Sequence, residues 1–472
     1  MNQQIEHAIE QFRNQAGRYR RTKRYYSGEH NLNFATEKFA NTFGDLFREF
    51  ALNLCPAVVD AMRDKLKITG FGIDSVRSGS ARSPIAAADK NAVDSSLDSE
   101  IDAIWRRNRM SVRSGEVHKE VLRCGDAYLI VWPGEDSRVR IFPNSAETCV
   151  LQYDDEEPGR ILWAAKYWRG ADKRTRLNLF FPDRIEKYVS KNEQDAFLPD
   201  AKSFTPLGSK FSVQESTVFQ PSPFREMSGG TVQPPAGAGG TDSGVVENPY
   251  GVVPVFHFAN NADIGSFGTS ELESAMPVQD GLNKAVLDML VAMEVCAFRQ
   301  RWVAGIEVKL SESTGEPVAP FTTGIDTVWQ SENPDARFGD FAASDLEQFL
   351  KVKDGFRIDI ASVTGTPLYY LMPQMGGFPS GESLRKAETR FLAKVRDRQE
   401  QFGSVWADAM SFALKVAGHR DVSLITNWED ASPVSEREML ENLLLKKELG
   451  ISVEQALREA GYGDIDVQRM TR

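Results

Sequence analysis

Residues 270–300, SELESAMPVQDGLNKAVLDMLVAMEVCAFRQ, decide the fold of this chain. Apolar side chains recur there at steps of three and four residues, at Val278, Leu282, Val286, Met289, Leu290, Met293 and Cys296. This spacing predicts one long helix. Some thirty helical residues would extend about 45 Å, which is longer than a typical globular helix. Pro277 predicts either a kink or the true start of the helix. We interpret the apolar stripe as a packing surface.

A second long helix is expected a short distance further along the chain, from Ser344 to Val363. Ser344 and Glu347 form a capping box at its start, and Gly365 and Pro367 predict its end. Its apolar positions are Leu346, Phe349, Leu350, Phe356, Ile360 and Val363. Between the two helices, residues 301–343 predict short strands at WVAGIEVKL and GIDTVWQ and a turn at ENPDARFGD. Two long helices therefore bracket a small β-containing insert.

A third long helix, of about 50 Å, is predicted from Glu382 to Val416, with Gly418 as its stop. A loop rich in glycine and proline, at residues 371–381, precedes it. The chain ends with short helices that begin at capping boxes and end at glycines. The capping pairs are Ser435 with Glu438 and Ser452 with Gln455, and the stops are Gly450 and Gly461.

The N-terminal half begins with helices and continues with strands. An amphipathic helix is expected from Pro56 to Lys67, stopped at Gly70, followed by a polar linker at 75–96 and a helical pair at 97–123 that ends at Gly125. The period then changes to two. The segments 126–145, 161–168 and 175–190 predict strands of an antiparallel sheet, and NPYGVVPVFHFANN at 248–261 predicts a strand that leads into the long helix. The apolar rhythm is lost from 192 to 248, which fits either a flexible surface loop or an interdomain linker.

Composition argues against several classes of protein. The 472 residues suit two to four packed units, and a hydrophobic content of 41% is enough for substantial cores. The four cysteines are scattered without a CxxC pair, which indicates a reducing compartment and neither disulfides nor structural zinc. The polar start, MNQQIEHAIEQF, predicts no signal peptide, and no apolar run is long enough for a membrane span. We expect a soluble protein that is intracellular when made.

The formal net charge of −11 bears on nucleic-acid binding. Tight DNA binding usually requires a basic face, because neutralising phosphates releases counterions. The stretch RNQAGRYRRTKRYYSGEHNL is the basic exception, and it has two interpretations. It is either a nucleic-acid-binding arm or, as we favour, a helix whose tyrosines pack and whose charges are solvated or paired with acidic residues.

Two motifs resemble functional sites, and neither carries the required chemistry. Residues 376–383, GGFPSGES, have the glycine and serine spacing of a P-loop, but Glu382 stands where the phosphate-binding lysine is needed. Residues 448–463 have the rhythm of a helix-turn-helix, yet Arg458 is offset by Glu454 and Glu459. The histidines are isolated in sequence: His7, His30, His118, His257 and His419. We therefore expect no catalytic residue, no cofactor and no metal site.

The order of the segments resembles the portal, or connector, family of tailed bacteriophages. The resemblance lies in RYYSGEHNL, NLCPAVVDAMRDKLKITGF, NPYGVVPVFHFANN, TGTPLYYLMPQMGGFPSGESLRKAETRF and EREMLENLLLKKELGISVEQAL, and it covers nearly the whole chain. It implies an α+β, mainly helical fold with a wing, long stem helices, a small β-containing clip, a tunnel loop and a short helical crown. By position, the wing is 1–269, the stem helices are 270–300 and 344–363, the clip is 301–343, the tunnel loop region is 364–381, the long wing helix is 382–418 and the crown is 419–472.

The resemblance also implies site residues and partners. The residues that it places in the tunnel loop, facing DNA, are Met372, Gln374, Met375, Gly376, Gly377, Phe378 and Pro379. The residues that it places in the clip, for partner docking, are Glu307, Lys309, Asp326, Trp329 and Arg337. The implied function is a non-enzymatic ring of twelve subunits that passes double-stranded DNA without sequence preference at one capsid vertex. The implied partners are the terminase large subunit, head–tail adaptor, major capsid and scaffolding proteins, and the implied location is the virion, after assembly in the host cytoplasm.

Two other functions stay open at this point. One is a DNA-processing or nucleotide-hydrolysing enzyme whose site has no recognised motif. The other is a DNA-binding regulator that uses the C-terminal helices. An acidic channel agrees with free passage of DNA, because mild repulsion, screened within about 8–10 Å, avoids stalling on phosphates.

Overall fold

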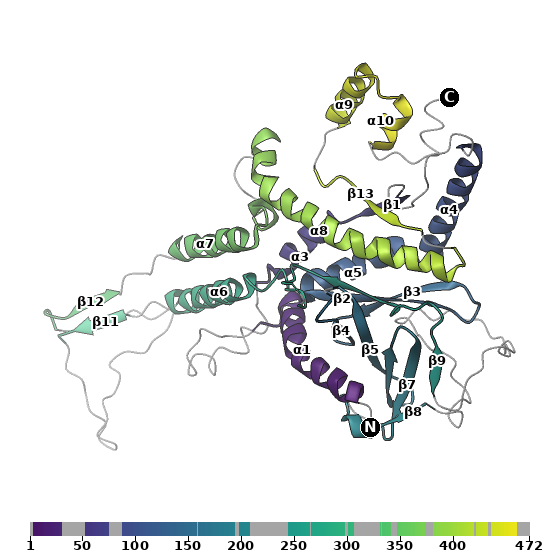
Figure 1. The fold of residues 1–472 in the computed structure, drawn as a ribbon. Helices are drawn as coiled ribbons and strands as arrows, with labels where there is room; N and C mark the ends of the chain where they lie inside the picture. The colour runs from purple at the N-terminus through teal and green to yellow at the C-terminus, as the bar shows by residue number, and fades with distance from the viewer. Residues whose placement is uncertain are drawn as a thin grey trace, which may run out of the picture. The chain divides into compact units, whose positions relative to one another are not determined.

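The computed structural model describes residues 3–30, 52–74, 87–157, 159–193, 198–207, 244–264, 266–297, 301–305, 331, 333–340, 347–372, 381–419, 422–432 and 436–459. The chain divides into two compact units. Unit 1 comprises residues 1–30, 53–277 and 360–472, and unit 2 comprises residues 31–52 and 278–359. Figure 1 shows the order of the elements along the chain.

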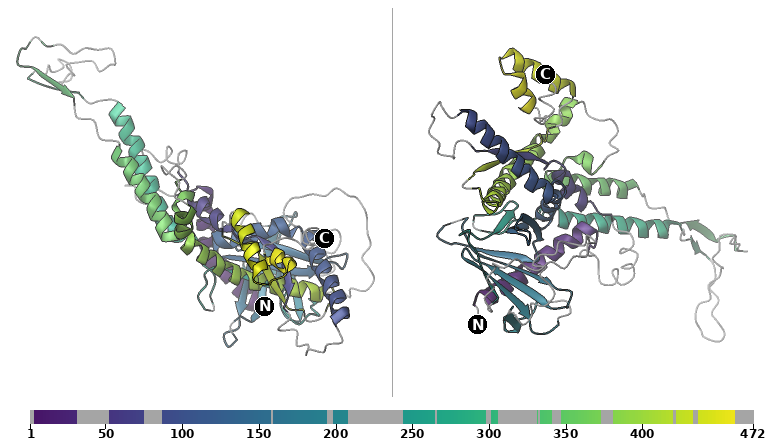
Figure 2. Two further views of the ribbon diagram at one scale, coloured as in Figure 1. Left: turned by 90° about the horizontal axis from the view of Figure 1, so that it is seen from above. Right: turned by 90° about the vertical axis from the view of Figure 1, so that its right-hand side faces the viewer.

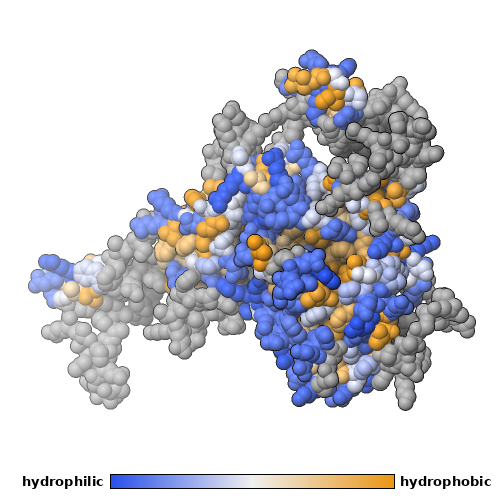
Figure 3. Space-filling model, in the orientation of Figure 1, coloured by the Kyte–Doolittle hydropathy of each residue, from blue (hydrophilic) through white to orange (hydrophobic). Residues whose placement is uncertain are grey.

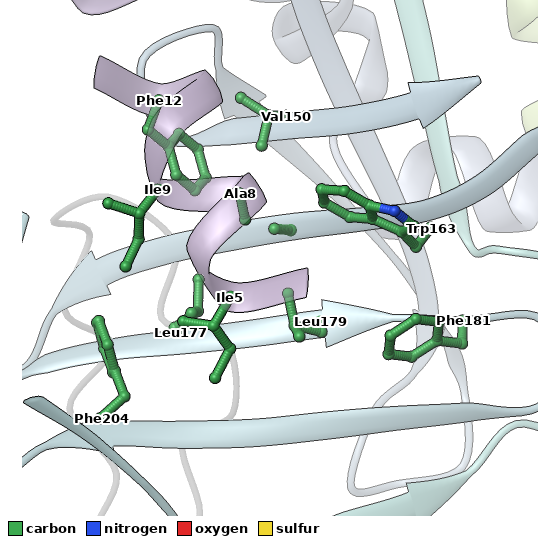
Figure 4. Packing of buried hydrophobic residues seen from close by; sticks show 11 residues of the cluster. Ile5, Ala8, Ile9, Phe12, Val150, Trp163, Leu177, Leu179, Phe181 and Phe204 are labelled. Carbon is green, nitrogen blue, oxygen red and sulfur yellow. The ribbon is translucent and has the colours of Figure 1, made fainter. Parts of the chain in front are cut away.

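A six-stranded antiparallel sheet forms one layer of unit 1. Its strands are β4 (Cys149–Tyr153), β5 (Ile161–Arg169), β6 (Thr175–Phe180), β7 (Arg184–Ser190), β8 (Phe204–Pro206) and β9 (Val245–Glu247). They follow the order β4-β5-β6-β7-β8, and β9 pairs with β7 beside β8. Helix α1 (Gln3–Ser27) covers one face of this sheet with Ile5, Ala8, Ile9 and Phe12, which pack on Val150, Trp163, Leu177 and Leu179 (Figure 4).

The opposite face of the sheet packs against a three-stranded antiparallel sheet of order β10-β2-β3. The strands are β2 (Asp126–Pro133), β3 (Val139–Ser145) and β10 (Val255–Ala259). The alternation of side chains explains this layering: Val150 of β4 points to α1, whereas its neighbours Cys149 and Leu151 join Tyr128 and Ile130 of β2 in a second core. Because the apolar side chains of β4 and β5 pack on both faces of the sheet, these strands contain consecutive buried residues, Cys149–Leu151 and Trp163–Ala165.

Two helices, α5 (Met110–Cys124) and α8 (Gly381–Val416), pack against the three-stranded sheet. Near α8 lies a small sheet of β1 (Ile68–Ile73) with β13 (Leu424–Trp428), a pairing of segments from opposite ends of the chain. The remaining elements of unit 1 are α3 (Cys55–Arg63), α4 (Ala87–Arg107), η1 (Ala201–Ser203), η3 (Leu368–Tyr370), α9 (Glu436–Glu448) and α10 (Val453–Glu459).

Two hairpins of unit 1, one in each larger sheet, repeat the same local sequence and geometry. Both read W-x-G-x-D-x-R-x-R, at residues 132–140 and 168–176. The amide of Gly134 donates to the carbonyl of Arg138 at 2.7 Å, and that of Gly170 donates to Arg174 at 2.9 Å. Each loop holds a non-glycine residue in the left-handed region, with φ of 56° at Ser137 and 57° at Lys173. The nine residues therefore specify the same turn twice.

Unit 2 contains most of α6 (Ala275–Ala297) and α7 (Glu347–Thr364), which run side by side, and the antiparallel pair β11 (Arg301–Ala304) and β12 (Arg337–Asp340) (Figure 2). A Cβ added to Gly281 of α6 would lie 2.8 Å from the ring of Phe356 of α7, so this glycine allows the two helices to approach. We call α6, α7, β11 and β12 the arm.

Most predicted elements are confirmed. The three long helices are present, and Pro277 lies in the first turn of α6, so it marks the start of that helix. Gly125, Gly365, Gly418 and Gly450 follow the ends of α5, α7, α8 and α9 with positive φ, as expected for helix stops. The α+β class and the antiparallel strands are also confirmed.

Three predictions were wrong. Helix α3 ends at Arg63, and Gly70 lies inside β1, where a register shift between Ile68 and Gly70 marks a bulge. Helix α4 begins at Ala87, so the polar linker is shorter than predicted. ENPDARFGD is not all turn, because its last four residues form β12 by pairing with β11. The capping residues Ser344 and Ser435 and the stop Gly461 lie outside the described residues.

Candidate functional site

The residues that the family resemblance places in the tunnel loop and clip lie mostly outside the described part of the chain. Met372 follows η3, and its amide donates to the carbonyl of Leu368 at 2.9 Å. Arg337 lies in β12, opposite Ala304 of β11. Gln374, Met375, Gly376, Gly377, Phe378 and Pro379 of the loop, and Glu307, Lys309, Asp326 and Trp329 of the clip, are outside the described ranges. These assignments stay predictions.

In unit 1, a group of hydrogen-bond donors surrounds the carboxylate of Asp126, which is fully buried at the start of β2. One carboxylate oxygen, Oδ2, accepts from the hydroxyl of Tyr19 and from the guanidinium of Arg18, each at 2.7 Å. The other, Oδ1, accepts from Nε2 of His257 at 2.8 Å and from the amide of Gly268 at 2.7 Å. One carboxylate thus connects α1, β2, β10 and the segment that leads to α6. We call this group the Asp126 network.

The Asp126 network includes a Tyr–His–Asp chain that resembles a catalytic relay. Nδ1 of His257 lies 2.8 Å from the hydroxyl of Tyr153, and the imidazole stacks on the ring of Tyr128 at 4.7 Å. In the neutral imidazole, Nε2 donates to the carboxylate, so Nδ1 accepts from the hydroxyl. Burial, with the negative charge of Asp126, raises the pKa of Tyr153 to about 12. A hydroxyl that resists ionisation is a poor nucleophile, and the geometry favours a structural role.

A second buried carboxylate, Glu271, lies just before α6 and is held by two cations of α8. Its Oε1 accepts from Nη2 of Arg398 at 3.2 Å, and its Oε2 accepts from Nζ of Lys394. The same ammonium of Lys394 donates to the carbonyl of Thr364, at the end of α7, at 3.0 Å. Burial alone would raise the pKa of Glu271, but the charges and hydrogen bonds of Lys394 and Arg398 outweigh it and hold this pKa below its ordinary value. We call this group the Glu271 network.

The backbone around Gly125, Asn260 and Gly268 is tightly packed, and it connects the Asp126 network to the Glu271 network. The amide of Asn260 donates to the carbonyl of Gly125 at 2.8 Å, and the side-chain amide of Asn260 donates to Oε1 of Glu271 at 3.1 Å. A Cβ on Gly268 would lie 2.1 Å from the carbonyl oxygen of Gly125, so no side chain fits there. We call the two networks and this connection the polar junction. Within it, both buried carboxylates receive hydrogen bonds from donors of the same chain.

Helix α5 contributes a buried histidine, His118, which contacts Trp406 of α8. Nε1 of Trp406 donates to Nε2 of His118 at 2.9 Å, and the rings of Phe402 and Trp428 lie 6.0 and 5.5 Å from the imidazole. Burial lowers the pKa of His118 to about 4. Protonation of Nε2 would also remove the acceptor for Trp406, so this histidine is a neutral part of an aromatic core.

The basic N-terminal stretch proves to be a packed helix. Tyr19 and Tyr25 are buried, Arg18 pairs with Asp126, and Lys23 lies 3.2 Å from both Glu120 and Glu147. Arg13 and Arg24 pair with Asp200 and Glu29. The interpretation favoured from the sequence, packed tyrosines and paired charges, is confirmed for these side chains.

Sequence reasoning missed the junction, although one signal was available. Asp126 stands directly after the helix stop Gly125 and opens an apolar strand, a place where an unpaired charge would be costly. Glu271, Lys394 and Arg398 look like ordinary surface charges in the sequence, and only the fold brings them together. Among the described residues, no group of three or more His, Cys, Asp or Glu side chains could hold a metal ion. No described helix is both long enough and apolar enough to cross a membrane.

Comparison with known proteins identifies the family. The pattern of the family described as "Phage portal protein, SPP1 Gp6-like" matches residues 5–461. The chain belongs to this portal family. Curated relatives agree: the portal protein of Mycobacterium phage L5 is 27% identical over 197 residues, covering 40% of each chain. The portal protein of Mycobacterium phage D29 is 26% identical over 235 residues, covering 47% of this chain and 48% of that protein. The matched portion is less than half the length of either relative.

Two chains from solved structures of gene transfer agent particles also match this chain, at low similarity. A chain of the neck of an empty particle, computed with C6 symmetry, gives a TM-score of 0.43 at 11% identity, covering 86% of this chain and 90% of that chain. A chain of the neck of a native particle, computed with C12 symmetry, gives 0.39 at 13% identity, covering 74% and 79%.

Proposed function

We propose that this portal-family chain forms a ring-shaped channel at one capsid vertex, through which DNA is packaged and later ejected. The observation that carries the proposal is the family match over residues 5–461. The described structure supports it, because its buried charges are satisfied within the chain and its long helices leave apolar side chains exposed, as expected of a subunit that assembles.

The parts of the channel follow the family resemblance. The helices within 270–300 and 344–363 form the stem, residues 301–343 form the clip, and 364–381 form the tunnel loop, with the wing, long wing helix and crown as assigned above. The ring holds twelve subunits and passes double-stranded DNA without reading its sequence. The clip docks the terminase large subunit and later a head–tail adaptor, and the ring contacts major capsid and scaffolding proteins. The subunit is made in the host cytoplasm and ends in the virion.

Electron microscopy of the purified chain tests the proposal. At concentrations that permit assembly, we expect rings with an axial hole and twelve-fold class averages. Compact particles without a hole, at every concentration and also when the chain is made together with the other capsid proteins, would overturn it.

We propose that the chain has no catalytic role of its own, so that ATP hydrolysis in packaging belongs to the terminase. The expected result is ATPase and nuclease activity at the level of a buffer control. Activity that disappears on substitution of one acidic residue would favour the enzyme alternative.

A further inference from the structure

Three polar side chains form a row across the six-stranded sheet of unit 1. Lys166 of β5 lies opposite Asn178 of β6, and Asn178 lies opposite Lys187 of β7. Residues directly opposite each other in antiparallel strands place their side chains on the same face of the sheet. We call these three residues the lysine row. It is created by the strand register, so no single strand indicates it in the sequence.

The lysine row lies on the face of the sheet that is turned away from α1. Leu177 and Leu179, the neighbours of Asn178 along β6, belong to the core under α1 (Figure 4), and side chains alternate between the faces of a strand. The row therefore shares the opposite face with Cys149 of β4, which lies opposite Lys166 and belongs to the second core. It borders the packed region between the two larger sheets.

The central residue of the row is buried with an unused donor. Asn178 is 2% exposed, and its Nδ2 group has no hydrogen-bond partner among the described residues. Such a group is unfavourable, because the hydrogen bonds that it made to water in the unfolded chain are not replaced. Buried side-chain donors in folded proteins usually have an acceptor. The amide of Asn178 therefore indicates an acceptor that the described part of the chain does not supply.

The lysines on either side of Asn178 are half-buried. No described carboxylate forms an ion pair with the ammonium group of Lys187, and burial lowers the pKa of this lysine. The ammonium of Lys166 lies 5.6 Å from the ring centre of Trp168, and burial lowers its pKa to about 8, although the thiol of Cys149 acts in the opposite direction. Burial disfavours the charged form of an amine, and a nearby anion favours it. An anion at the row would thus stabilise both lysines in their charged form.

Two carboxylates that lie close to the row in the sequence are engaged elsewhere. Glu186 precedes Lys187, but alternation along β7 puts it on the opposite face, where it accepts from Nε of Arg184 at 2.8 Å. Asp172, in the hairpin between β5 and β6, pairs with Arg176 at 3.0 Å. Neither carboxylate neutralises the lysine row.

We propose that the lysine row binds a small oxyanion, of which inorganic phosphate is the simplest example. Oxygens of the anion accept from Nδ2 of Asn178 and from the ammonium groups of Lys166 and Lys187. Neighbouring strands lie about 4.8 Å apart, so the backbones of the two lysines are separated by about 10 Å, and both side chains can reach an anion placed over Asn178. Hydrogen bonds between ammonium groups and phosphate oxygens are stronger than those between neutral groups.

A free anion fits this site better than the phosphates of duplex DNA. The central amide is buried, so a ligand must be small enough to reach it. The net charge of −11 also repels a polyanion more strongly than a single phosphate. The bound anion joins β5, β6 and β7 through side chains, and it stabilises the folded chain by mass action. This site is independent of the proposed ring, so its absence would leave the proposed function unchanged.

Stabilisation by phosphate tests the site. Thermal unfolding of the full chain is measured in sodium phosphate and in sodium chloride of equal ionic strength. We expect phosphate to raise the midpoint further than chloride does, with saturation. Lys187→Met keeps the alkyl chain and removes the charge, and it should weaken the apparent affinity by at least about tenfold, whereas Lys187→Arg should retain binding. Lys202→Met makes the same change at an exposed lysine of η1 and should bind like the parent. Equal stabilisation by phosphate and chloride, or an equal response of the parent and Lys187→Met, would overturn the inference.

Chemical labelling of the parent chain provides a second test that needs no variant. Lysines are acetylated with an amine-reactive ester, and the rate at each position is measured by mass spectrometry with and without phosphate. We expect phosphate to slow the labelling of Lys166 and Lys187 and to leave Lys202 unchanged. Equal rates with and without phosphate at the two lysines of the row would overturn the inference, and so would protection by duplex DNA but not by phosphate.

Discussion

The polar junction of unit 1 and the arm differ in which unfavourably placed side chains they contain: the junction contains buried charges, and the arm contains exposed apolar side chains. In the junction, Asp126 and Glu271 are removed from water, and every charge around them is met by a partner of the same chain. In the arm, the apolar side chains of Met293, Leu350 and Ile358 are left exposed, although the carboxylate of Asp280 in α6 is buried. Figure 3 shows apolar surface over α6 and α7. An unpaired buried charge strongly destabilises a folded chain, whereas an exposed apolar face mainly favours association. The comparison teaches that the junction pairs its buried charges within the chain, whereas the arm keeps part of its apolar surface exposed.

The largest effect should come from breaking the Glu271 network. Glu271→Ala leaves Lys394 and the buried Arg398 without their shared anion, and we expect a loss of about 3–5 kcal/mol in the free energy of unfolding. Urea titration followed by tryptophan fluorescence measures it. Glu273→Ala, at an exposed position two residues away, should cost less than about 0.5 kcal/mol. Equal losses of unfolding free energy in the two variants would show that the buried ion pairs of Glu271 do not stabilise the fold.

Acid should weaken unit 1 through His118. Its pKa is about 4 in the folded chain and near 6.5 when unfolded, so the unfolded state binds more protons between these values. Stability therefore falls as the pH is lowered through this window, by about 3 kcal/mol in total. His118→Gln can still accept from Trp406 and does not titrate, so its stability should depend less on pH above 4.5. An unchanged slope in this variant would contradict the assignment.

Two tyrosines contact His257, and they differ in hydrogen bonding: the hydroxyl of Tyr153 is hydrogen-bonded to the imidazole, and the hydroxyl of Tyr128 is not. Tyr153→Phe removes the partner of Nδ1 of His257 and should cost about 1–2 kcal/mol. Tyr128 stacks on the same imidazole, but its buried hydroxyl has no hydrogen-bond partner among the described residues, so Tyr128→Phe should be neutral or slightly stabilising. Thermal unfolding of the two variants side by side measures the difference. A larger loss from Tyr128→Phe would reverse the roles that we assign.

The smallest effect on the isolated subunit is expected in the arm. Leu350→Ser replaces a leucine that is 47% exposed, and the free energy of unfolding of the monomer should change by less than about 0.5 kcal/mol. The same denaturant titration, at concentrations below assembly, measures it. A loss comparable to that of Glu271→Ala would mean that the arm is stabilised within one chain, and the contrast with the junction would disappear.

The elements that the sequence predicts well are those with a local cause. The spacing in α6, the glycines after α5 and α7, and the alternation in β2 each act over a few residues, and each prediction was confirmed. The short strands β1 and β13 were missed, because their pairing joins Ile68 to Trp428 across most of the chain. Neither strand has enough alternation by itself to indicate a partner so far away.

The candidate site was harder to predict, because its chemistry depends on distant residues. Asp126 meets His257 across 131 positions, and Glu271 meets Arg398 across 127. Each residue type is common on surfaces, and only burial distinguishes these four. The tunnel loop and clip residues rest on family resemblance, and they stay predictions.

Lys394 has a mechanical consequence, because its ammonium group holds both Glu271 and the carbonyl of Thr364. These residues lie close to the two points where the chain passes between its units, at 277–278 and 359–360. One side chain of α8 therefore fixes both the segment that leads into α6 and the last residue of α7. Substitution of Lys394 is expected to release these two segments together.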